Sequence, residues 1–217
     1  MQPTNTERAT HLIVFDLDGT LLEAESSWGT VNTFFENDNS ETLQLFRSGA
    51  IDYLECMRRD VAAWPNPLHI SRIRDALSGW TLRPGAAEML ETLHEWGIET
   101  AILSGGIDVL ATEVAAQLGI EQCVANELIT DEHGFLTGES RMRVDPLRKE
   151  IALAQLCRER HVALEHCITI GDSEMDESIL RASGLGVLLG DAETAEALGV
   201  RSVLALSEFV ELVASER

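Results

Sequence analysis

Two aspartates, Asp16 and Asp18, follow directly after the apolar segment at residues 11–15. An extended backbone directs alternate side chains to the same side, so both carboxylates can share one small site. One carboxylate could attack phosphorus as a nucleophile, while the other protonates the leaving oxygen and later activates water. The pair therefore fits covalent phosphoryl transfer, and an ordinary acidic turn after a strand is the alternative.

Ser104, Gly105 and Gly106 follow a second apolar segment. A hydroxyl group and backbone N–H groups at a helix start can hold phosphoryl oxygens, and glycine lets the backbone approach them closely. The same tripeptide is also a good helix N-cap and turn. Both interpretations predict a strand that ends at about residue 103 and a helix that begins at Ser104.

Lys149 is the single lysine in a chain whose other Lys or Arg positions are all arginine. Its charge could neutralise a nucleophilic carboxylate and the charge that spreads over a transferring phosphoryl group. The neighbouring Arg148 is the alternative cation for this role. An ordinary solvated lysine on a helix is the interpretation without chemistry.

Asp172 and Asp176 follow a third apolar segment, in the sequence GDSEMD at residues 171–176. Carboxylate oxygens suit Mg²⁺, which prefers octahedral oxygen ligation with few carboxylates and several waters. Acidic residues also stabilise a helix N-terminus through the helix dipole. The hexapeptide therefore fits either a metal site or a simple helix start.

The elements that must position these residues alternate along the chain. Apolar segments typical of buried strands alternate with helical patterns that end at about residues 96, 118, 160 and 182. This alternation predicts a parallel sheet with helices on both faces, in which ligands gather beyond the carboxyl ends of the strands. The strand segments lie at residues 11–15, 99–103, 123–125, 167–170 and 185–189.

Two segments depart from the alternation. Residues 26–80 show helical patterns broken by Asn, Gly and Pro, which predicts an all-helical insertion. Residues 127–137, with DEHG at their centre, predict a β-hairpin. We therefore expect an α/β core formed by residues 1–20 and 82–217, with a small helical domain at residues 21–81.

The sequence FDLDGT at residues 15–20 resembles the first signature of the haloacid dehalogenase superfamily, and its two aspartates resemble the phosphatase branch. The resemblance implies that Asp16 is the nucleophile and Asp18 the general acid/base. Ser104 and Lys149 stand in the family's order along the chain as its phosphate-binding hydroxyl and catalytic lysine. The resemblance also implies a Rossmann-like core with a helical cap inserted after the first strand.

Residues 171–176 resemble the family's fourth signature, in which acidic residues complete a magnesium site. The resemblance implies Mg²⁺ as the cofactor. Its protein ligands would be Asp16, the backbone carbonyl of Asp18, and Asp172. Asp176 would orient a water molecule or support the metal ligands without binding the metal directly.

The tripeptide Ser104, Gly105 and Gly106 resembles the phosphoserine phosphatase subgroup in particular, and implies phosphate binding by these three residues. Glu25 stands where that subgroup carries a cap glutamate that contacts the substrate's amino group. A solvated acid in a polar turn is the alternative for Glu25.

The subgroup's cap arginine, which binds the substrate carboxylate, has no direct match. Asp60 lies nearest the expected position, so Arg58, or else Arg59, would take this role after a local shift. L-Phosphoserine is the first candidate substrate, and a sugar, glycerol or carboxylic-acid phosphate is the alternative. A phosphotransferase and a noncatalytic binding protein are the other function classes.

The composition of the chain limits the classes of molecule that it can bind. The chain carries 16 Lys and Arg against 37 Asp and Glu, a formal charge of -21, which repels nucleic acid and anionic membrane surfaces. No segment approaches the ~18 consecutive apolar residues of a membrane span. We expect a cytoplasmic protein, monomer or homodimer, whose partner is a small phosphorylated metabolite.

Overall fold

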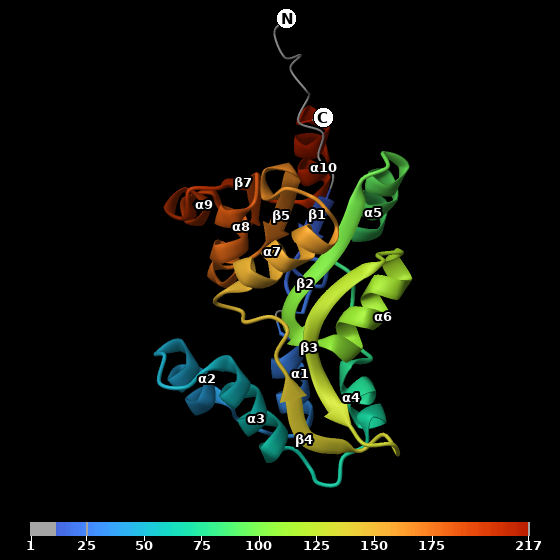
Figure 1. Cartoon of the computed structure of the whole chain (residues 1–217), viewed down its shortest axis with the longest axis vertical. Coiled ribbons are helices and arrows are strands. Elements are labelled where there is room, and N and C mark those ends of the chain that lie inside the picture. Colours follow the sequence, from blue (N-terminus) through green and yellow to red (C-terminus); the bar gives the residue numbers. More distant parts are fainter. Residues whose placement is uncertain (1–11, 25, 217) are drawn as a thin grey trace, which may run out of the picture.

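The computed structural model describes residues 12–24 and 26–216. Strands and helices alternate through most of the chain, and the strands form one seven-stranded sheet in the order β4-β3-β2-β1-β5-β6-β7 (Figure 1). The strands are β1 (Leu12–Phe15), β2 (Glu99–Ile107), β3 (Gln122–Thr130), β4 (Leu136–Arg141), β5 (Cys167–Gly171), β6 (Leu185–Leu189) and β7 (Arg201–Val203).

The helices fall into an early group and a group interleaved with the strands. The early helices are α1 (Ser27–Phe34), α2 (Ser40–Arg47), α3 (Tyr53–Ala63) and α4 (Ile70–Leu77). The later helices are α5 (Ala86–Glu95), α6 (Asp108–Leu118), α7 (Lys149–Glu159), α8 (Glu177–Ala182), α9 (Ala192–Leu198) and α10 (Leu206–Ser215), with short 3₁₀ turns at Leu164–His166 and Glu174–Asp176. No described helix has the length and apolar character needed to cross a membrane.

Strand β1 lies at the centre of the sheet and is buried along its whole length. It pairs in parallel with β2 on one side and with β5 on the other. The carboxyl ends of these three strands therefore meet at one edge of the sheet. The predicted α/β fold with a mostly parallel sheet is confirmed, with β4 as its antiparallel strand.

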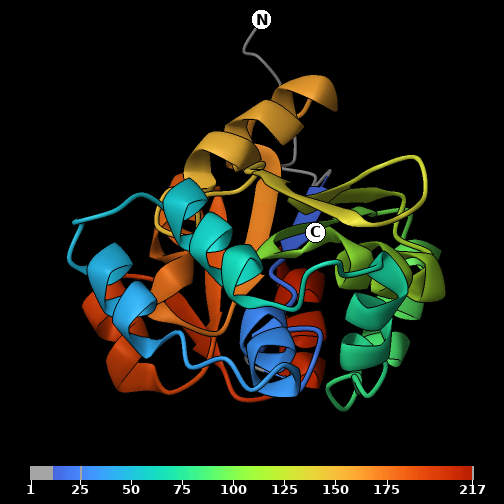
Figure 2. The same cartoon turned by 90° about the horizontal axis from the view of Figure 1, so that it is seen from below.

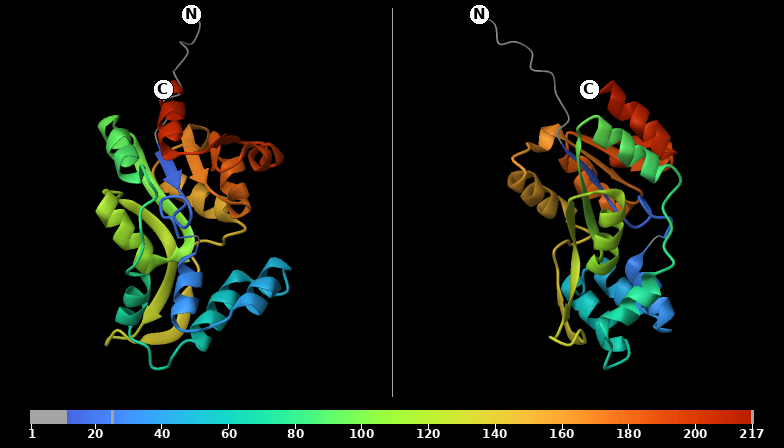
Figure 3. Two further views of the ribbon diagram at one scale, coloured as in Figure 1. Left: turned by 180° about the vertical axis from the view of Figure 1, so that it is seen from behind. Right: turned by 90° about the vertical axis from the view of Figure 1, so that its right-hand side faces the viewer.

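Helices cover both faces of this sheet. Leu12 and Val14 point to the face covered by α7, α8 and α9, whereas Ile13 and Phe15 point to the face covered by α5, α6 and α10. Phe15 meets Phe209 of α10 edge to face, with ring centroids 6.1 Å apart. Figure 3 (right) shows α7 on one side of the sheet and α5 and α10 on the other.

The early helices lie beyond the carboxyl ends of β1 and β5 (Figure 1), and the view from that end shows them in front of the sheet (Figure 2). Helix α3 packs against β4, and α4 packs against α6. An isolated bridge between His69 and Phe135 joins the early segment to the β3–β4 hairpin. The apolar residues of α1, α3 and α4 belong to the same buried cluster as those of α5, α6 and α10. Residues 21–81 thus contain four helices, as expected for the insertion, and their standing as a separate domain stays a prediction.

The structure corrects the predicted boundary after β2. Ser104, Gly105 and Gly106 do not open a helix, because β2 continues to Ile107 and α6 begins at Asp108. The extended backbone is stabilised by side chains: Gly106 N–H donates to the Ser104 hydroxyl, and Ile107 N–H donates to the Ser27 hydroxyl. These hydrogen bonds replace those that a helix start would have supplied.

Two other boundaries differ from the prediction. Helix α7 begins at Lys149 rather than near Pro146, because a turn closed by the Arg148 N–H to Asp145 C=O hydrogen bond precedes it. The predicted short strand at residues 123–125 and the first arm of the hairpin form one continuous strand, β3. The hairpin itself is confirmed.

Candidate active site

Asp16 stands at the carboxyl end of β1, where its N–H donates to the carbonyl of Ile170 in β5. Lys149, the first residue of α7, reaches the same point from the neighbouring helix. Its Nζ lies 2.6 Å from Asp16 Oδ1 and 2.6 Å from Asp176 Oδ1. The structure therefore brings together the predicted nucleophile, the predicted cation and one of the predicted metal-site acids.

Lys149 is buried, with 4% of its surface exposed. Burial opposes its charge, but Asp16 and then Asp176 outweigh that effect and raise the pKa of Lys149 well above its usual value. The ammonium group is therefore charged at neutral pH. It supplies a fixed positive charge beside Asp16, as electrostatic stabilisation of a phosphoryl group requires.

Asp172 and Asp176 sit directly after β5 and differ in how their oxygens are used. Asp176 Oδ1 accepts from Lys149, and Oδ2 accepts from the N–H groups of Asp172 and Ser173 and from the Ser173 hydroxyl. Asp172 Oδ1 accepts from the Thr20 hydroxyl, at 3.1 Å. Asp172 thus keeps an oxygen for a ligand, whereas Asp176 is committed to holding Lys149 and the turn.

The carboxylates of Asp16, Asp172 and Asp176 could hold a metal ion, since one oxygen of each lies within 4.8 Å of the others. Burial and the charge of Asp176 raise the pKa of Asp16, and the same two causes raise the pKa of Asp172 to about 6. Three carboxylates face a single ammonium, so the site has excess negative charge. A hard divalent cation with oxygen ligands, such as Mg²⁺, fits this donor set.

Gly19 makes the close approach of Asp172 possible. A Cβ at Gly19 would lie 2.3 Å from Asp172 Oδ2, and the backbone φ of +83° is one that glycine adopts without strain. The loop after β1 is also fixed from outside, because the Arg83 guanidinium donates to the carbonyls of Gly19 and Thr20. The glycine of the FDLDGT sequence is therefore a packing requirement of the acidic cluster.

Asp18 projects into the same pocket as Asp16. Its Oδ2 accepts from both the N–H and the hydroxyl of Ser27, at 2.9 and 2.8 Å. Its Oδ1 has no hydrogen-bond partner among the described residues. Burial raises the pKa of Asp18, and the two Ser27 hydrogen bonds act in the opposite direction.

Ser104 and the two glycines after it close the other side of the site. The Ser104 hydroxyl accepts from Gly106 N–H, so its own hydrogen is available to a ligand. Gly106 cannot carry a side chain, because a Cβ would lie 2.4 Å from the Ser27 hydroxyl and 2.7 Å from Asp18 Oδ2. The Gly105 carbonyl accepts from Trp28 Nε1, Tyr53 Oη and Asn126 Nδ2.

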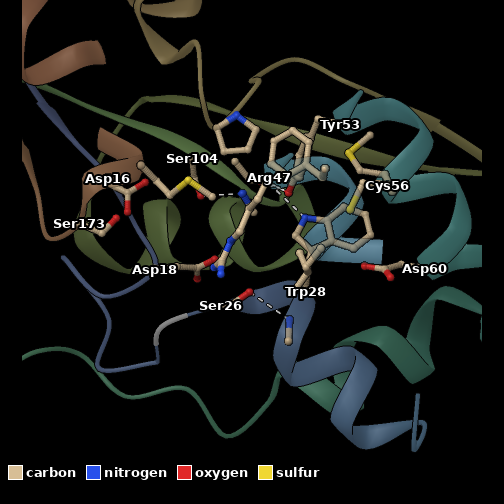
Figure 4. A pocket seen from close by; sticks show the side chains of 18 of the residues that line it. Asp16, Asp18, Ser26, Trp28, Arg47, Tyr53, Cys56, Asp60, Ser104 and Ser173 are labelled. Carbon is tan, nitrogen blue, oxygen red and sulfur yellow. Dashed lines mark hydrogen bonds between the residues drawn. The ribbon is translucent and has the colours of Figure 1, made fainter. Parts of the chain in front are cut away.

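These groups open onto a pocket of about 560 Å³ that lies between the sheet edge and the early helices. Figure 4 shows Asp16, Asp18 and Ser173 at one side of the pocket and the α3 residues Tyr53, Cys56 and Asp60 at the other. The side chains of Arg47 and Trp28 lie between these two groups.

The structure does not bring Arg58 into this pocket. Helix α3 turns Tyr53, Cys56 and Asp60 toward the cavity, whereas Arg58 and Arg59 lie on its exposed face and pair with Glu55. Because Arg58 lies on the side of α3 that faces solvent, it does not reach a ligand in this pocket in the structure described. Arg148, the alternative cation, is likewise exposed beside Glu150, and Glu25 lies outside the described residues.

Comparison with known proteins gives the family. The protein-family model described as haloacid dehalogenase-like hydrolase matches residues 13–181 of this chain. These residues include Asp16, Ser104, Lys149 and Asp172. The chain belongs to this family.

This haloacid dehalogenase-like hydrolase is similar to curated phosphoserine phosphatases. The one from Lactococcus lactis subsp. lactis (strain IL1403) is 30% identical over 216 residues, covering 94% of this chain and 97% of that protein. The one from Archaeoglobus fulgidus is 29% identical over 196 residues, covering 89% of this chain but 56% of that protein. The chain thus spans little more than half the length of the Archaeoglobus relative.

A solved phosphoserine phosphatase, described as a phospho-aspartyl intermediate analogue, has the same fold. Its TM-score is 0.78 at 22% identity, and the match covers 94% of this chain and 99% of that chain. At this identity the likeness supports the fold of the hydrolase and leaves the roles of single residues to their geometry.

Sequence reasoning missed two residues of the hydrolase site, Ser27 and Arg47. Ser27 follows the N-cap Ser26 of α1, so a helix start at this point was readable from the sequence, but its contact with Asp18 was not. Arg47 ends the short helix α2 and lines the pocket (Figure 4). Trp28 stacks on Trp64 and also lines the pocket.

Proposed function

We propose that this protein is a magnesium-dependent phosphomonoester hydrolase that forms a covalent aspartyl-phosphate on Asp16. The observation that carries the proposal is Asp16 held 2.6 Å from the buried Lys149 ammonium, in a pocket that also presents the unpartnered Oδ1 of Asp18. A nucleophile beside a fixed cation and a separate acid/base is the arrangement that covalent phosphoryl transfer needs.

In the first half-reaction, Asp16 attacks phosphorus and the bond from phosphorus to the alcohol oxygen breaks. Asp18 donates its proton to the departing alcohol oxygen. In the second half-reaction, Asp18 takes a proton from water as the water oxygen bonds to phosphorus and the Asp16–phosphorus bond breaks. Inorganic phosphate and the free alcohol leave, and both aspartates return to their starting states.

The remaining residues hold the phosphoryl group. Ser104 donates its free hydroxyl hydrogen to a phosphoryl oxygen, while Lys149 offsets the oxygen charge that develops in the transition state. Gly105 and Gly106 keep side chains out of the space that the phosphate needs. Asp16, the Asp18 carbonyl and Asp172 are the proposed ligands of Mg²⁺, and Asp176 fixes Lys149 behind them. When bound, Mg²⁺ neutralises phosphoryl oxygens and orients the ester for attack.

L-Phosphoserine is the substrate that the relatives support best, since the curated proteins described above are phosphoserine phosphatases. Glu25 is the proposed contact for the amino group. For the carboxylate we propose Arg47 in place of Arg58, because Arg47 reaches the pocket and no hydrogen bond or ion pair with a described residue engages it. Residues 21–81 would act as the cap that excludes bulk water.

Phosphate release with Mg²⁺ tests the proposal on L-phosphoserine, phosphoglycolate, glycerol phosphate and sugar phosphates, with Asp16→Asn as control. Turnover that Asp16→Asn abolishes supports the mechanism, and selectivity for phosphoserine supports the substrate. Arg47→Gln is expected to raise the KM for phosphoserine, while the matched surface variant Arg58→Gln leaves it unchanged. Absence of turnover that depends on Asp16 would favour a phosphotransferase or a binding protein.

The proposed function also bears on the binding partner, the location and the oligomeric state of the protein. A small phosphorylated metabolite, rather than a nucleic acid, suits a chain with a formal charge of -21. A cytoplasmic location and a monomeric or homodimeric state stay predictions.

A further inference from the structure

Ser27 of α1 hydrogen-bonds to the predicted general acid, Asp18. It is the first residue of α1, and 1% of its surface is exposed. Its N–H and its hydroxyl both lie within hydrogen-bond distance of a single atom, Asp18 Oδ2, at 2.9 and 2.8 Å. One oxygen of Asp18 is therefore held by two donors from one residue.

The direction of the hydroxyl hydrogen bond is determined by its surroundings. Ile107 N–H lies 3.1 Å from the Ser27 hydroxyl, and an N–H group can only donate. The Ser27 oxygen is therefore the acceptor from Ile107, and its single hydrogen is directed to Asp18. Ser27 thus links β2, which carries Ser104, to the carboxyl group of Asp18.

The other oxygen of Asp18 is left for chemistry. Asp18 Oδ1 has no hydrogen-bond partner among the described residues, and Asp18 lines the pocket that contains Asp16. A proton on Oδ2 would point at two donor groups, whereas a proton on Oδ1 meets no such conflict. The two oxygens of Asp18 are therefore not equivalent.

We propose that Ser27 is a positioning residue that reserves Asp18 Oδ1 for exchange of the proton with the leaving alcohol and then with water. This inference rests on the proposed function, because it assigns an atom and an orienting partner to the acid/base step. As the phosphorus–alcohol bond breaks, the hydrogen on Oδ1 passes to the alcohol oxygen. As water attacks the aspartyl-phosphate, Oδ1 takes the hydrogen back.

The position of Ser27 ties this step to the seating of α1. The next residue, Trp28, donates from its indole N–H to the Gly105 carbonyl at 3.1 Å. The start of α1 therefore contacts the acid through Ser27 and the phosphate-binding strand through Trp28. Displacement of α1 from this position would free Asp18 to rotate, so the acid is oriented only while α1 is docked.

The test compares two leaving groups in Ser27→Ala. A p-nitrophenolate leaving group departs without protonation, whereas the alkoxide of glycerol phosphate or phosphoserine requires it. We expect kcat/KM for the alkyl ester to fall about 10- to 100-fold, because kcat/KM covers the steps up to departure of the alcohol and general acid catalysis contributes about 10²–10⁴-fold when the acid is correctly placed. We expect kcat/KM for p-nitrophenyl phosphate to fall less than about 3-fold, since departure of p-nitrophenolate does not use the acid. Hydrolysis of the aspartyl-phosphate is common to both esters and enters kcat alone, so kcat does not separate them.

Ser27→Cys supplies a graded variant, because a thiol of similar shape is a weaker donor. Its ratio of kcat/KM for the alkyl ester to kcat/KM for the aryl ester is expected between those of the wild type and Ser27→Ala, and this ratio tests the proposal if Ser27→Ala does not fold. Ser26→Ala is the matched control, since it removes the hydroxyl that accepts from Gly29 N–H, a hydrogen bond that does not involve Asp18. It is expected to keep the wild-type ratio even where stability falls.

Equal losses of kcat/KM on both esters, or an unchanged ratio of the two kcat/KM values in Ser27→Ala and Ser27→Cys, would overturn the role of Ser27. If the wild type still turns over both esters and Asp16→Asn abolishes both, the proposed phosphatase mechanism survives that outcome. Failure of the wild type to hydrolyse either ester would overturn the mechanism and the role of Ser27 together.

Discussion

Lys149→Met tests the charge balance of the site without altering its shape greatly, because Met has a similar length and no charge. The change leaves Asp16 and Asp176 buried without the ammonium that lies 2.6 Å from each. Removing one partner of a buried ion pair costs about 3–5 kcal/mol, because the remaining charge is uncompensated. For a domain of this size about 1 kcal/mol corresponds to roughly 2–4 °C, so we expect Tm to fall by roughly 6–20 °C.

The assay is thermal unfolding followed by circular dichroism, at pH 7 with a chelator so that no divalent ion replaces the lost charge. Arg148→Met is the matched control, because Arg148 is the neighbouring cation and its 3.7 Å pair with Glu150 lies at the surface. Exposed pairs contribute about 0–1 kcal/mol, so the control is expected to lower Tm by less than about 4 °C.

The effect of Lys149→Met should depend on pH with a definite sign. The pKa of Lys149 is raised in the folded state, so its stabilisation is complete below its unfolded pKa and is fully present at pH 7. The pKa of Asp16 is also raised, by burial and by Asp176, and the charge of Lys149 limits that rise. Without Lys149, Asp16 takes up a proton more readily, so the deficit should shrink from pH 7 to pH 5. A fall in Tm no larger than that of Arg148→Met at pH 7 would refute the reasoning.

Three further outcomes follow from the geometry. Burial and Asp176 raise the pKa of Asp172 from the ordinary value of 3.8 to about 6. The metal-free protein therefore loses stability as the pH rises from 3.8 to about 6. The gain in Tm on addition of Mg²⁺ should accordingly be larger at pH 7 than at pH 5. Gly106→Ala should lower phosphatase activity about 100-fold, measured as phosphate release, because its Cβ would lie 2.7 Å from Asp18 Oδ2. Phe209→Ala should cost about 3–5 kcal/mol in urea unfolding, because the ring is fully buried against Phe15.

The convergence of the site residues could be predicted because it follows from the sheet. Asp16, Ser104 and Asp172 each follow an apolar segment, and parallel strands place such residues at one edge. Lys149 could be singled out by composition, since it is the chain's one lysine. The alternation of strands and helices therefore carried most of the information about where these residues meet.

Contacts that depend on the rotation of a helix could not be predicted as well. On α3 the apolar residues Tyr53, Cys56 and Met57 recur at helical spacing and define the buried face, and Asp60 continues it one turn later. Arg58 lies off this stripe, so a closer use of the periodicity would have excluded it. Arg47 gave no such signal, because it ends an eight-residue helix whose packing depends on its neighbours.

The Gly105 carbonyl shows why the substrate pocket and the chemistry are difficult to separate in this fold. It accepts from Trp28 of α1, from Tyr53 of α3 and from Asn126 of β3, so two of the early helices are anchored on the strand that carries Ser104. An unpaired buried donor costs about 1–3 kcal/mol, so releasing either helix carries a penalty unless water replaces the carbonyl. Because Trp28 and Tyr53 also line the pocket, a substitution there to alter substrate choice would also disturb the strand that binds phosphate. Changes at Arg47, which makes no such anchor, should alter substrate choice at lower cost to turnover.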